Sequence, residues 1–544
     1  MQPRSLVRRG YGGRRRLITH GAYRLDLAMS IGLASMTLVV HAVRYMLGTS
    51  FWNDEIWVAI SLKVPLHDVP TVIASTPIGW DLLLRAVPMN GTHPEGSRVI
   101  PLIFAALTVI AAYWYLRLLP WRTQAVARLA AVAGAVMALL SPSALLRNDL
   151  KQYTCDAFCV LVVLMLTAHA ERTDGWKPLA VLTATASVLF LFANPAGLAL
   201  LAALASLGIV AAARRDWKRL RQVVVSSLCA VAALGATYVL FYAHGNIPGL
   251  RQYWESNYVP VAQGPVAMWH WFWGIAPAWF HVVGVGPVLI ALPLFVLGTI
   301  AIGRLGLPAT GVTVLTLLIE MVCLAAMRQY PIFDVRTMHF LAIAYAVTVA
   351  AGAVYWITWL NRGAIGIAAT LAVIAATVAW HGQGIRQHSI PGQPTGEDVA
   401  ALKAGYRPGD VILANVPSTW SIAYYWGGPV RIVPSAHSQQ KFRAYAISGP
   451  AILDLCPEKS DGSGDIVLPH GNPLCDTAAG IHAALDRAWR ATGPAHRIFF
   501  YNLQGRHADF LAIRSWAIAH HYALVRPNSV PGTMLNLLMP RTNG

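Results

Sequence analysis

The sequence predicts an all-α polytopic membrane protein with about eleven transmembrane helices and a small α/β domain at its C-terminus. Hydrophobic residues make up 56% of the chain and charged residues 12%. The mean hydropathy of +0.50 is typical of proteins embedded in lipid. Long apolar runs recur through residues 25–381, whereas short apolar strands alternate with helical patterns in residues 397–544. The intervening residues 382–396 are rich in Gly, Pro and Gln and predict a linker.

The N-terminal tail, residues 1–24, is strongly basic, and we expect it in the cytoplasm. A second basic cluster lies at residues 214–221. An odd number of spans places both clusters inside and the C-terminal domain on the outer face of the membrane. The net charge of +18 then reflects topology and attraction to membrane lipids, and not nucleic-acid binding.

A transmembrane helix needs about 20 predominantly apolar residues. The fifth and sixth candidate segments are short and meet at Asn194-Pro195, so they could instead form a hairpin or a re-entrant pair. No small-residue cleavage site follows the first segment, which we interpret as a retained span. The predicted spans are 27–47, 98–117, 125–141, 153–170, 179–193, 195–213, 222–243, 280–303, 308–326, 337–359 and 363–381.

The first outer loop, residues 48–97, contains two adjacent acids, Asp54 and Glu55, directly after the first span. Carboxylates are costly to bury in a membrane protein, so this pair could face a pocket in which one of them activates an acceptor hydroxyl as a base. Alternatively, Asn53 could cap an interfacial helix, with the two acids facing its positive end.

The turn between the third and fourth spans concentrates charge, with Arg147, Asp149, Lys151 and Asp156 within ten residues. These side chains could pair with one another and close the turn. Alternatively, Lys151 and Arg147 could neutralise a donor phosphate. We favour the phosphate clamp, because a purely structural turn needs no charge at the membrane.

A further cation, Arg336, lies at the outer start of the tenth span in the segment Tyr330–Phe340. It could pair with Asp334, or its guanidinium could bind a leaving phosphate in bidentate fashion. The preceding outer segment, 244–279, is dense in aromatic residues that could form an interfacial belt or a sugar platform.

The C-terminal region contains no phosphate-binding glycine motif and no nucleophile motif, so we expect it to support the core or bind an acceptor. Its pattern predicts strands near 410–416, 430–433, 497–501, 522–526 and 534–539, and helices near 481–491 and 508–521. If the domain lies outside the cell, we expect Cys456 and Cys475 to form a disulfide.

Three motifs occur in an order that resembles the GT-C membrane glycosyltransferases, including bacterial members similar to protein O-mannosyltransferases and lipid A aminoarabinose transferases. They are Asp54-Glu55, Lys151-Gln-Tyr153 with Asp156, and Tyr330-Pro331 followed by Arg336. The resemblance covers most of residues 25–381. It implies a helical fold with two interfacial helices in the first outer loop. It also implies inverting transfer of a sugar from a polyprenyl-phosphate-linked donor to a hydroxyl of a glycan, lipid or protein.

The same resemblance implies roles for individual residues. Asp54 would be the base with Glu55 beside it, Lys151 and Arg336 would hold the donor phosphate, and Tyr153 would position it. Where members of the family often have a Glu before the basic-x-Tyr element, this sequence has Asp149. That departure leaves the role of Asp149 open.

Two alternatives stay open at this stage. A transporter or flippase of lipid-linked saccharides needs the same cations and aromatic groove but no base, although the sequence shows no duplicated half. A non-catalytic assembly partner would use the C-terminal domain to bind another envelope protein. The two acids could hold a divalent ion, but no second cluster of Asp, Glu or His completes a shell, so no metal is firmly predicted.

Overall fold

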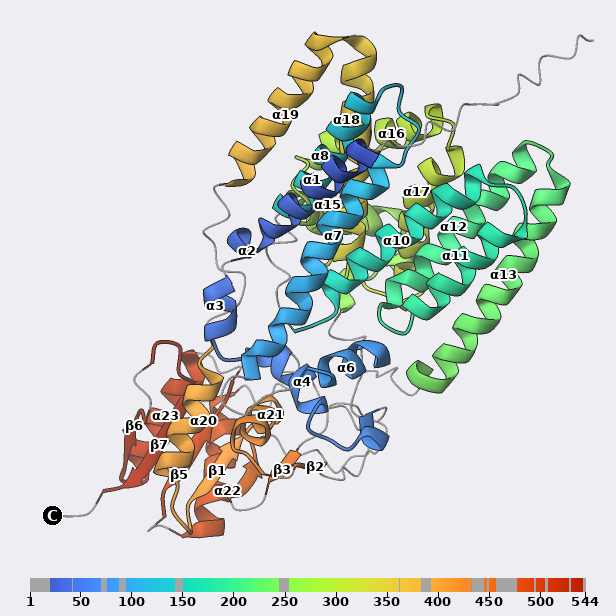
Figure 1. Ribbon diagram of the computed structural model, residues 1–544. Coiled ribbons are helices and arrows are strands. Elements are labelled where there is room, and N and C mark those ends of the chain that lie inside the picture. Colours follow the sequence, from blue (N-terminus) through green and yellow to red (C-terminus); the bar gives the residue numbers. More distant parts are fainter. Residues whose placement is uncertain are drawn as a thin grey trace, which may run out of the picture.

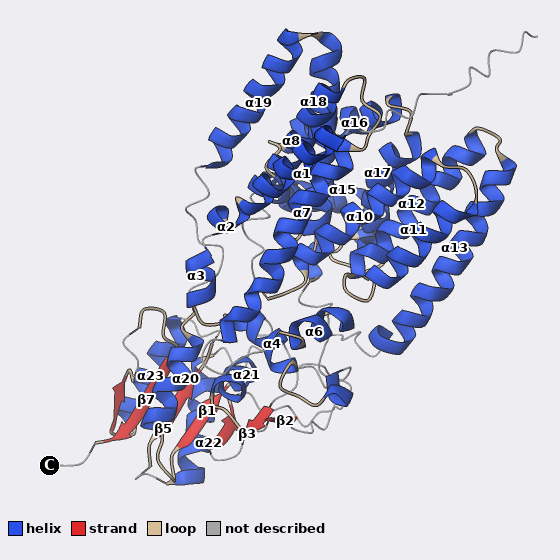
Figure 2. Cartoon of the chain, viewed as in Figure 1, coloured by secondary structure: helices blue, strands red, loops and turns tan. Residues whose placement is uncertain are grey.

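The computed structural model shows a bundle of long helices with a small sheet-containing domain at one end (Figures 1 and 2). It describes residues 20–41, 43–69, 76–87, 94–141, 150–243, 254–361, 363–382, 393–428, 430–432, 445–447, 450–455, 477–493, 496–503, 507–527 and 530–541. The predicted fold class, a helical membrane protein with a small C-terminal α/β domain, is confirmed.

Seven described helices are long and apolar enough to cross a membrane, or eight if the bent pair α15 and α16 forms one span. Helices α8 and α19 are shorter and also apolar. The bundle consists of α1 (His20–Ser35), α2 (Thr37–Val40), α7 (Val99–Arg117), α8 (Gln124–Leu140), α10 (Tyr153–Arg172), α11 (Trp176–Leu189), α12 (Asn194–Ala213), α13 (Trp217–Thr237), the π-helix η3 (Tyr238–Tyr242), α15 (Gly264–Val283), α16 (Val288–Arg304), α17 (Pro308–Ala326), α18 (His339–Leu360) and α19 (Ala364–Gly382).

The fifth and sixth predicted spans form a helical hairpin. Helix α11 ends at Leu189 and α12 begins at Asn194, with Pro195 in its first turn, where the missing amide hydrogen costs nothing. Elsewhere the bundle packs through small residues: a Cβ added to Gly352 of α18 would lie 2.6 Å from the Cα of Gly298 on α16. Small residues thus let these two backbones approach closely, as is common between membrane helices.

The first outer loop contains α4 (Asn53–Ser61) and α6 (Ile78–Arg85), preceded by α3 (Val43–Gly48) and followed by the 3-10 helix η2 (Pro94–Arg98). A second 3-10 helix, η1 (Leu66–Asp68), lies between them. The amide of Gly79 donates to the carbonyl of Leu191 at 2.7 Å, and the indole of Trp80 donates to the carbonyl of Leu150 at 3.0 Å. These bonds fix α6 against the α11–α12 turn and the start of α10.

The C-terminal domain is built on a five-stranded sheet with the order β4-β1-β5-β7-β6. Strands β4, β1 and β5 are parallel, and β7 runs antiparallel to both β5 and β6. Its elements are α20 (Thr395–Gly405), β1 (Val411–Ala414), α21 (Val416–Tyr425), β2 (Val430–Ile432), β3 (Tyr445–Ile447), β4 (Ala451–Asp454), α22 (Ala478–Thr492), β5 (Ile498–Tyr501), α23 (His507–Ala519), β6 (Tyr522–Val525) and β7 (Leu535–Pro540). Cys456 and Cys475 lie outside the described residues.

Candidate functional site

Glu55 is a structural residue at the start of α4. Its carboxylate accepts a hydrogen bond from the amide of Trp52 at 3.1 Å, which closes a capping box around the first turn. Trp52 is therefore the N-cap residue, and the expectation that Asn53 caps this helix was wrong, because Asn53 is already the first helical residue. Of the two interpretations of the acid pair, the one in which an acid faces the positive end of a helix therefore applies to Glu55.

Glu55 is also the partner of Arg98, and neither side chain is exposed. The guanidinium Nε of Arg98 donates to Glu55 Oε1 at 2.7 Å, and its other nitrogens donate to the carbonyls of Thr49 and Ser50. Arg98 directly precedes the second predicted span, where an arginine side chain often extends to the membrane surface, but here the side chain is buried. A buried carboxylate that lies within reach gives the guanidinium better compensation than the interface does.

Asp54 remains partly exposed and meets two cations from distant parts of the chain. Its Oδ2 lies 3.6 Å from the Nζ of Lys151 and also accepts a hydrogen bond from the guanidinium of Arg336. The side chain of Asp54 is 22% exposed, and those of Lys151 and Arg336 are 8% and 20% exposed. The three residues form one partly open cluster, hereafter the Asp54 cluster, with one more positive than negative charge.

Lys151 is positioned through its neighbour Leu150. The amide of Leu150 donates to Glu55 Oε1 at 3.0 Å, so one buried carboxylate fixes both the helix that carries Asp54 and the segment that carries Lys151. The ammonium of Lys151 lies 5.0 Å from the ring centre of Trp57, one turn along α4 from Asp54. This cation–π contact holds the ammonium beside the carboxylate.

Arg336 is positioned by its local turn. Asp334 Oδ1 accepts hydrogen bonds from the amides of Arg336 at 2.9 Å and Thr337 at 2.8 Å. The carboxylate of Asp334 thus binds the backbone, which leaves the guanidinium to reach Asp54 and to lie 5.5 Å from the ring centre of Trp254. Asp334 therefore shapes the turn through the backbone and the guanidinium joins the Asp54 cluster, while its binding to a leaving phosphate stays a prediction.

Of the remaining predicted site residues, Tyr153 and Asp156 lie in the first turn of α10, and both are buried. Asp156 Oδ1 has no hydrogen-bond partner among the described residues. Burial, reinforced by the carboxylates of Asp156 and Asp334, raises the pKa of Tyr330 well above its usual value, and its hydroxyl donates to the carbonyl of Thr337. Arg147 and Asp149 lie outside the described residues, so the structure does not place them.

The C-terminal domain contacts the same helix. The amide of Asn53 donates to Gln393 Oε1 at 2.8 Å, and the amide of Phe51 donates to the hydroxyl of Tyr425 at 2.9 Å. The indole of Trp420 stacks on Trp57 with ring centres 6.0 Å apart. Because Trp57 also contacts Lys151, the domain is connected to the Asp54 cluster through a single side chain.

The sequence analysis did not assign Trp57 or Trp420 to this site. It included Trp254 only as a member of the aromatic segment 244–279. Trp57 could have been found from its spacing, since a residue three positions after Asp54 shares its helix face. Trp420 gave no such signal, because only tertiary packing brings it to α4. A divalent cation fits this arrangement poorly: Asp54 already binds two cations, Glu55 is fully paired, and the described part of the chain holds no group of three His, Cys, Asp or Glu side chains.

No protein-family model and no curated protein sequence matches the chain. Solved structures do match. The archaeal oligosaccharyltransferase AglB from Archaeoglobus fulgidus, solved with an inhibitory peptide and a dolichol-phosphate, aligns with a TM-score of 0.53 and 12% identity over 94% of this chain and 74% of AglB. The apo form of ArnT from Cupriavidus metallidurans aligns with a TM-score of 0.50 and 11% identity over 95% of this chain and 97% of ArnT. At such low identity these likenesses establish the fold.

Proposed function

We propose that this chain, which has the fold of the GT-C membrane glycosyltransferases, transfers a sugar from a polyprenyl-phosphate donor to a hydroxyl acceptor with inversion at the anomeric carbon. The observation that carries the proposal is the Asp54 cluster, in which one partly exposed carboxylate meets two cations from separate segments. A carboxylate can accept the acceptor's proton, and the cations can stabilise the phosphate that leaves. AglB, which shares the fold, was solved with a dolichol-phosphate, which supports a polyprenyl-phosphate donor.

In this mechanism the donor phosphate binds Lys151 and Arg336, whose combined charge exceeds that of Asp54. The acceptor oxygen attacks the anomeric carbon while the bond from that carbon to the phosphate oxygen breaks. The electron pair of that bond leaves with the polyprenyl phosphate, and the acceptor proton passes to Asp54. Attack from the face opposite the leaving phosphate inverts the configuration.

Donor binding also prepares the base. Without donor, Oδ2 of Asp54 is engaged by both cations, so this oxygen is poorly placed to accept a proton. When the phosphate takes over Lys151 and Arg336, Asp54 is released to face the acceptor. Donor binding thus frees Oδ2 of Asp54 to act as the base.

The location of the chemistry follows from the charge rule. The basic tail, residues 1–24, is assigned to the cytoplasm, which places α4 and the C-terminal domain on the outer face of a bacterial inner membrane. The acceptor is then a glycan, lipid or protein of the cell envelope. We expect side chains around the Asp54 cluster to select the sugar of the donor. Turnover with a panel of polyprenyl-phosphate sugars identifies which sugar is accepted.

The test is sugar transfer by the purified full-length protein in detergent, with a panel of polyprenyl-phosphate sugars and wild type beside Asp54→Asn. Loss of a general base costs roughly 100- to 10,000-fold in rate, so we expect turnover of Asp54→Asn to fall within that range with donor still bound. Asp68→Asn, which changes a partly exposed acid of the same loop, is the matched control and should keep turnover within about twofold.

Two results would contradict the proposal. Equal turnover by Asp54→Asn and wild type would exclude Asp54 as the base. Binding of intact donor without turnover by the wild type, for every donor in the panel, would instead favour the transporter.

A further inference from the structure

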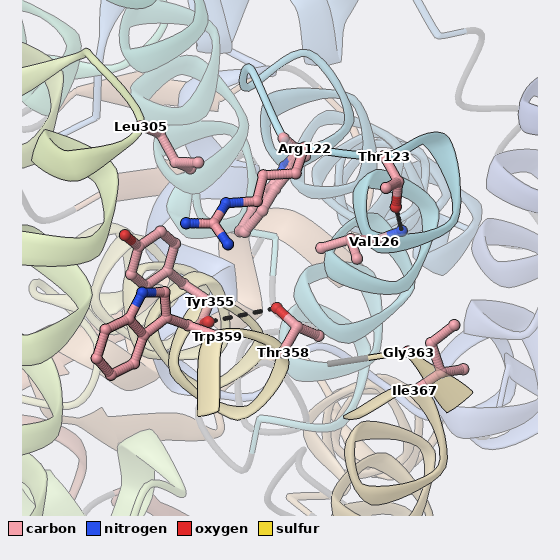
Figure 3. Close-up of a pocket in the computed structure, with 10 residues that line it drawn as sticks. Arg122, Thr123, Val126, Leu305, Tyr355, Thr358, Trp359, Gly363 and Ile367 are labelled. Carbon is pink, nitrogen blue, oxygen red and sulfur yellow. Dashed lines mark hydrogen bonds between the residues drawn. The ribbon is translucent and has the colours of Figure 1, made fainter. Parts of the chain in front are cut away.

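A second site lies at the opposite end of the bundle from the Asp54 cluster. Helix α7 begins at Val99, beside the Arg98–Glu55 pair, and ends at Arg117, so its 19 residues cover roughly 28 Å at 1.5 Å per residue. The connection that follows, together with the last turns of α18 and the start of α19, encloses a cavity of about 300 Å³. Figure 3 shows this cavity with its lining side chains.

The walls of the cavity are apolar and aromatic, with one cation among them. Trp121, Tyr355 and Trp359 supply the aromatic surface, and Ile367 supplies part of the aliphatic surface. Arg122 is the only charged residue that lines the cavity within the described part of the chain. Its guanidinium is directed across the opening toward Tyr355 (Figure 3). Among the described residues it has no acidic partner.

A second cation lies nearby. Arg304 ends α16, next to the lining residue Leu305, and its guanidinium lies 4.9 Å from the ring centre of Trp356. No described carboxylate is paired with it. Arg122 in the cavity lining and Arg304, beside the lining residue Leu305, are thus two positive charges without an acidic partner among the described residues.

Two buried or partly buried acids at this end of the bundle, Asp26 and Glu171, are already engaged. Asp26 binds Arg117 at 2.8 Å and Arg128 at 2.9 Å. Glu171 accepts hydrogen bonds from the amides of Ala309 and Thr310 at 2.8 and 2.7 Å and so caps α17. Neither is therefore available to neutralise the cations of the cavity.

We propose that this cavity binds an anionic phospholipid of the cytoplasmic leaflet, independently of the proposed transfer reaction. The headgroup phosphate would bind Arg122 and Arg304, and one acyl chain would lie against Tyr355, Trp359 and Ile367. Aromatic residues at span ends lie at headgroup depth, and basic residues there attract anionic lipid. An apolar slot continuous with a cationic rim suits an amphiphile better than free phosphate, which would gain nothing from the walls.

The test is native mass spectrometry of the full chain in detergent, titrated with phosphatidylglycerol. We expect Arg122→Gln to weaken the tightest lipid-binding event by about fivefold or more, the loss expected for one basic contact. Arg221→Gln removes an equivalent exposed charge from α13 at the same end of the bundle, and should stay within about twofold of wild type. Val126→Trp, which fills the apolar part and keeps the charge, should also weaken binding.

Two outcomes would overturn the proposal. In the first, Arg122→Gln and wild type bind phosphatidylglycerol equally. In the second, inorganic phosphate displaces the lipid at millimolar concentration and Val126→Trp has no effect, which would make the ligand a free phosphate.

Discussion

The adjacent acids Asp54 and Glu55 carry the same charge but differ in their partners and in their exposure to solvent. Glu55 is fully enclosed and paired with Arg98, whereas Asp54, one residue earlier, remains 22% exposed beside Lys151 and Arg336. On a helix, adjacent residues point about 100° apart, so a single turn can direct one carboxylate inward and the next outward. The acids could be identified from the sequence, but the division of roles required the position of Arg98, 43 residues away.

At this scale the first prediction concerns Glu55→Gln. Removing one partner of a buried ion pair leaves the other charge uncompensated, at a cost of about 3–5 kcal/mol. We expect Glu55→Gln to lower the melting temperature of the detergent-solubilised protein by several degrees. Asp54→Asn is the matched variant, one residue away and partly exposed, and should leave the melting temperature nearly unchanged. Equal melting temperatures for Glu55→Gln and wild type would show that the Arg98 pair contributes nothing to stability.

A second residue-scale prediction separates charge from geometry at Arg336. Lys keeps the charge but lacks the planar fork that binds a phosphate through two nitrogens. We expect Arg336→Lys to weaken donor binding by roughly tenfold, which corresponds to about 1.4 kcal/mol, measured by competition with a labelled donor. Arg328→Lys, in the same connection but paired with the exposed Glu255, should bind donor like wild type. Wild-type affinity in Arg336→Lys would mean that the guanidinium does not contact the phosphate.

At the scale of elements, apolar periodicity predicted eleven spans, whereas the described residues contain seven helices long and apolar enough to cross a membrane, or eight with the bent pair. The first predicted span, 27–47, is divided among α1, α2 and α3, and one further boundary was misjudged. The aromatic residues of 264–279 were assigned to an outer segment, whereas they form α15, which meets α16 at a bend of 61°. The break has a local cause: Gly284 and Gly286 have φ of 79° and 110°, and Pro287 follows. The Gly-Val-Gly-Pro sequence could have been used to predict the break between the two helices. The helix before it was not predicted, because its many tryptophans give it the composition of an interfacial belt.

The contact between α4 and α21 is a further element-scale feature, and the hydroxyl of Tyr425, the last residue of α21, holds the segment that leads into α4. It accepts from the amide of Phe51 and donates to Glu95 Oε1 at 3.1 Å. Burial, with the Glu95 carboxylate adding to it, raises the pKa of Tyr425 well above its usual value, so the hydroxyl stays protonated. Tyr425→Phe leaves a buried amide and a carboxylate unsatisfied, which costs about 1–3 kcal/mol.

We therefore expect Tyr425→Phe to lower both the melting temperature and the rate of sugar transfer, because α4 carries Asp54. Tyr406→Phe is the matched control. Its hydroxyl accepts from the exposed amide of Ala451 within the C-terminal domain and does not touch α4. A Tyr425→Phe enzyme with wild-type turnover would show that the contact between α4 and α21 does not support the site.

At the scale of the whole molecule, composition was sufficient for the fold class, but not for the way its two parts meet. One hydrophobic core contains Phe51, Ile56 and Ile60 of the outer loop together with Val399 and Ile422 of the C-terminal domain. These segments lie more than 300 residues apart in sequence, and no local pattern records such a contact. Such a shared core depends on tertiary packing between elements. Sequence periodicity identifies the buried face of each element but not the element that packs against it.

This shared core leads to the last prediction, for a chain truncated after residue 396. The truncation removes Tyr425 and Trp420, the partners of Phe51 and Trp57, and exposes the apolar face of α4. We expect the truncated protein to remain helical and membrane-inserted, since the bundle packs through its own core, and to lose sugar transfer. Circular dichroism and size-exclusion chromatography establish that the bundle is intact before turnover is compared with the full chain. If the truncated protein is intact and transfers sugar at the full rate, then α4 holds Asp54 in place without the domain, and the domain has a separate task such as binding another envelope protein.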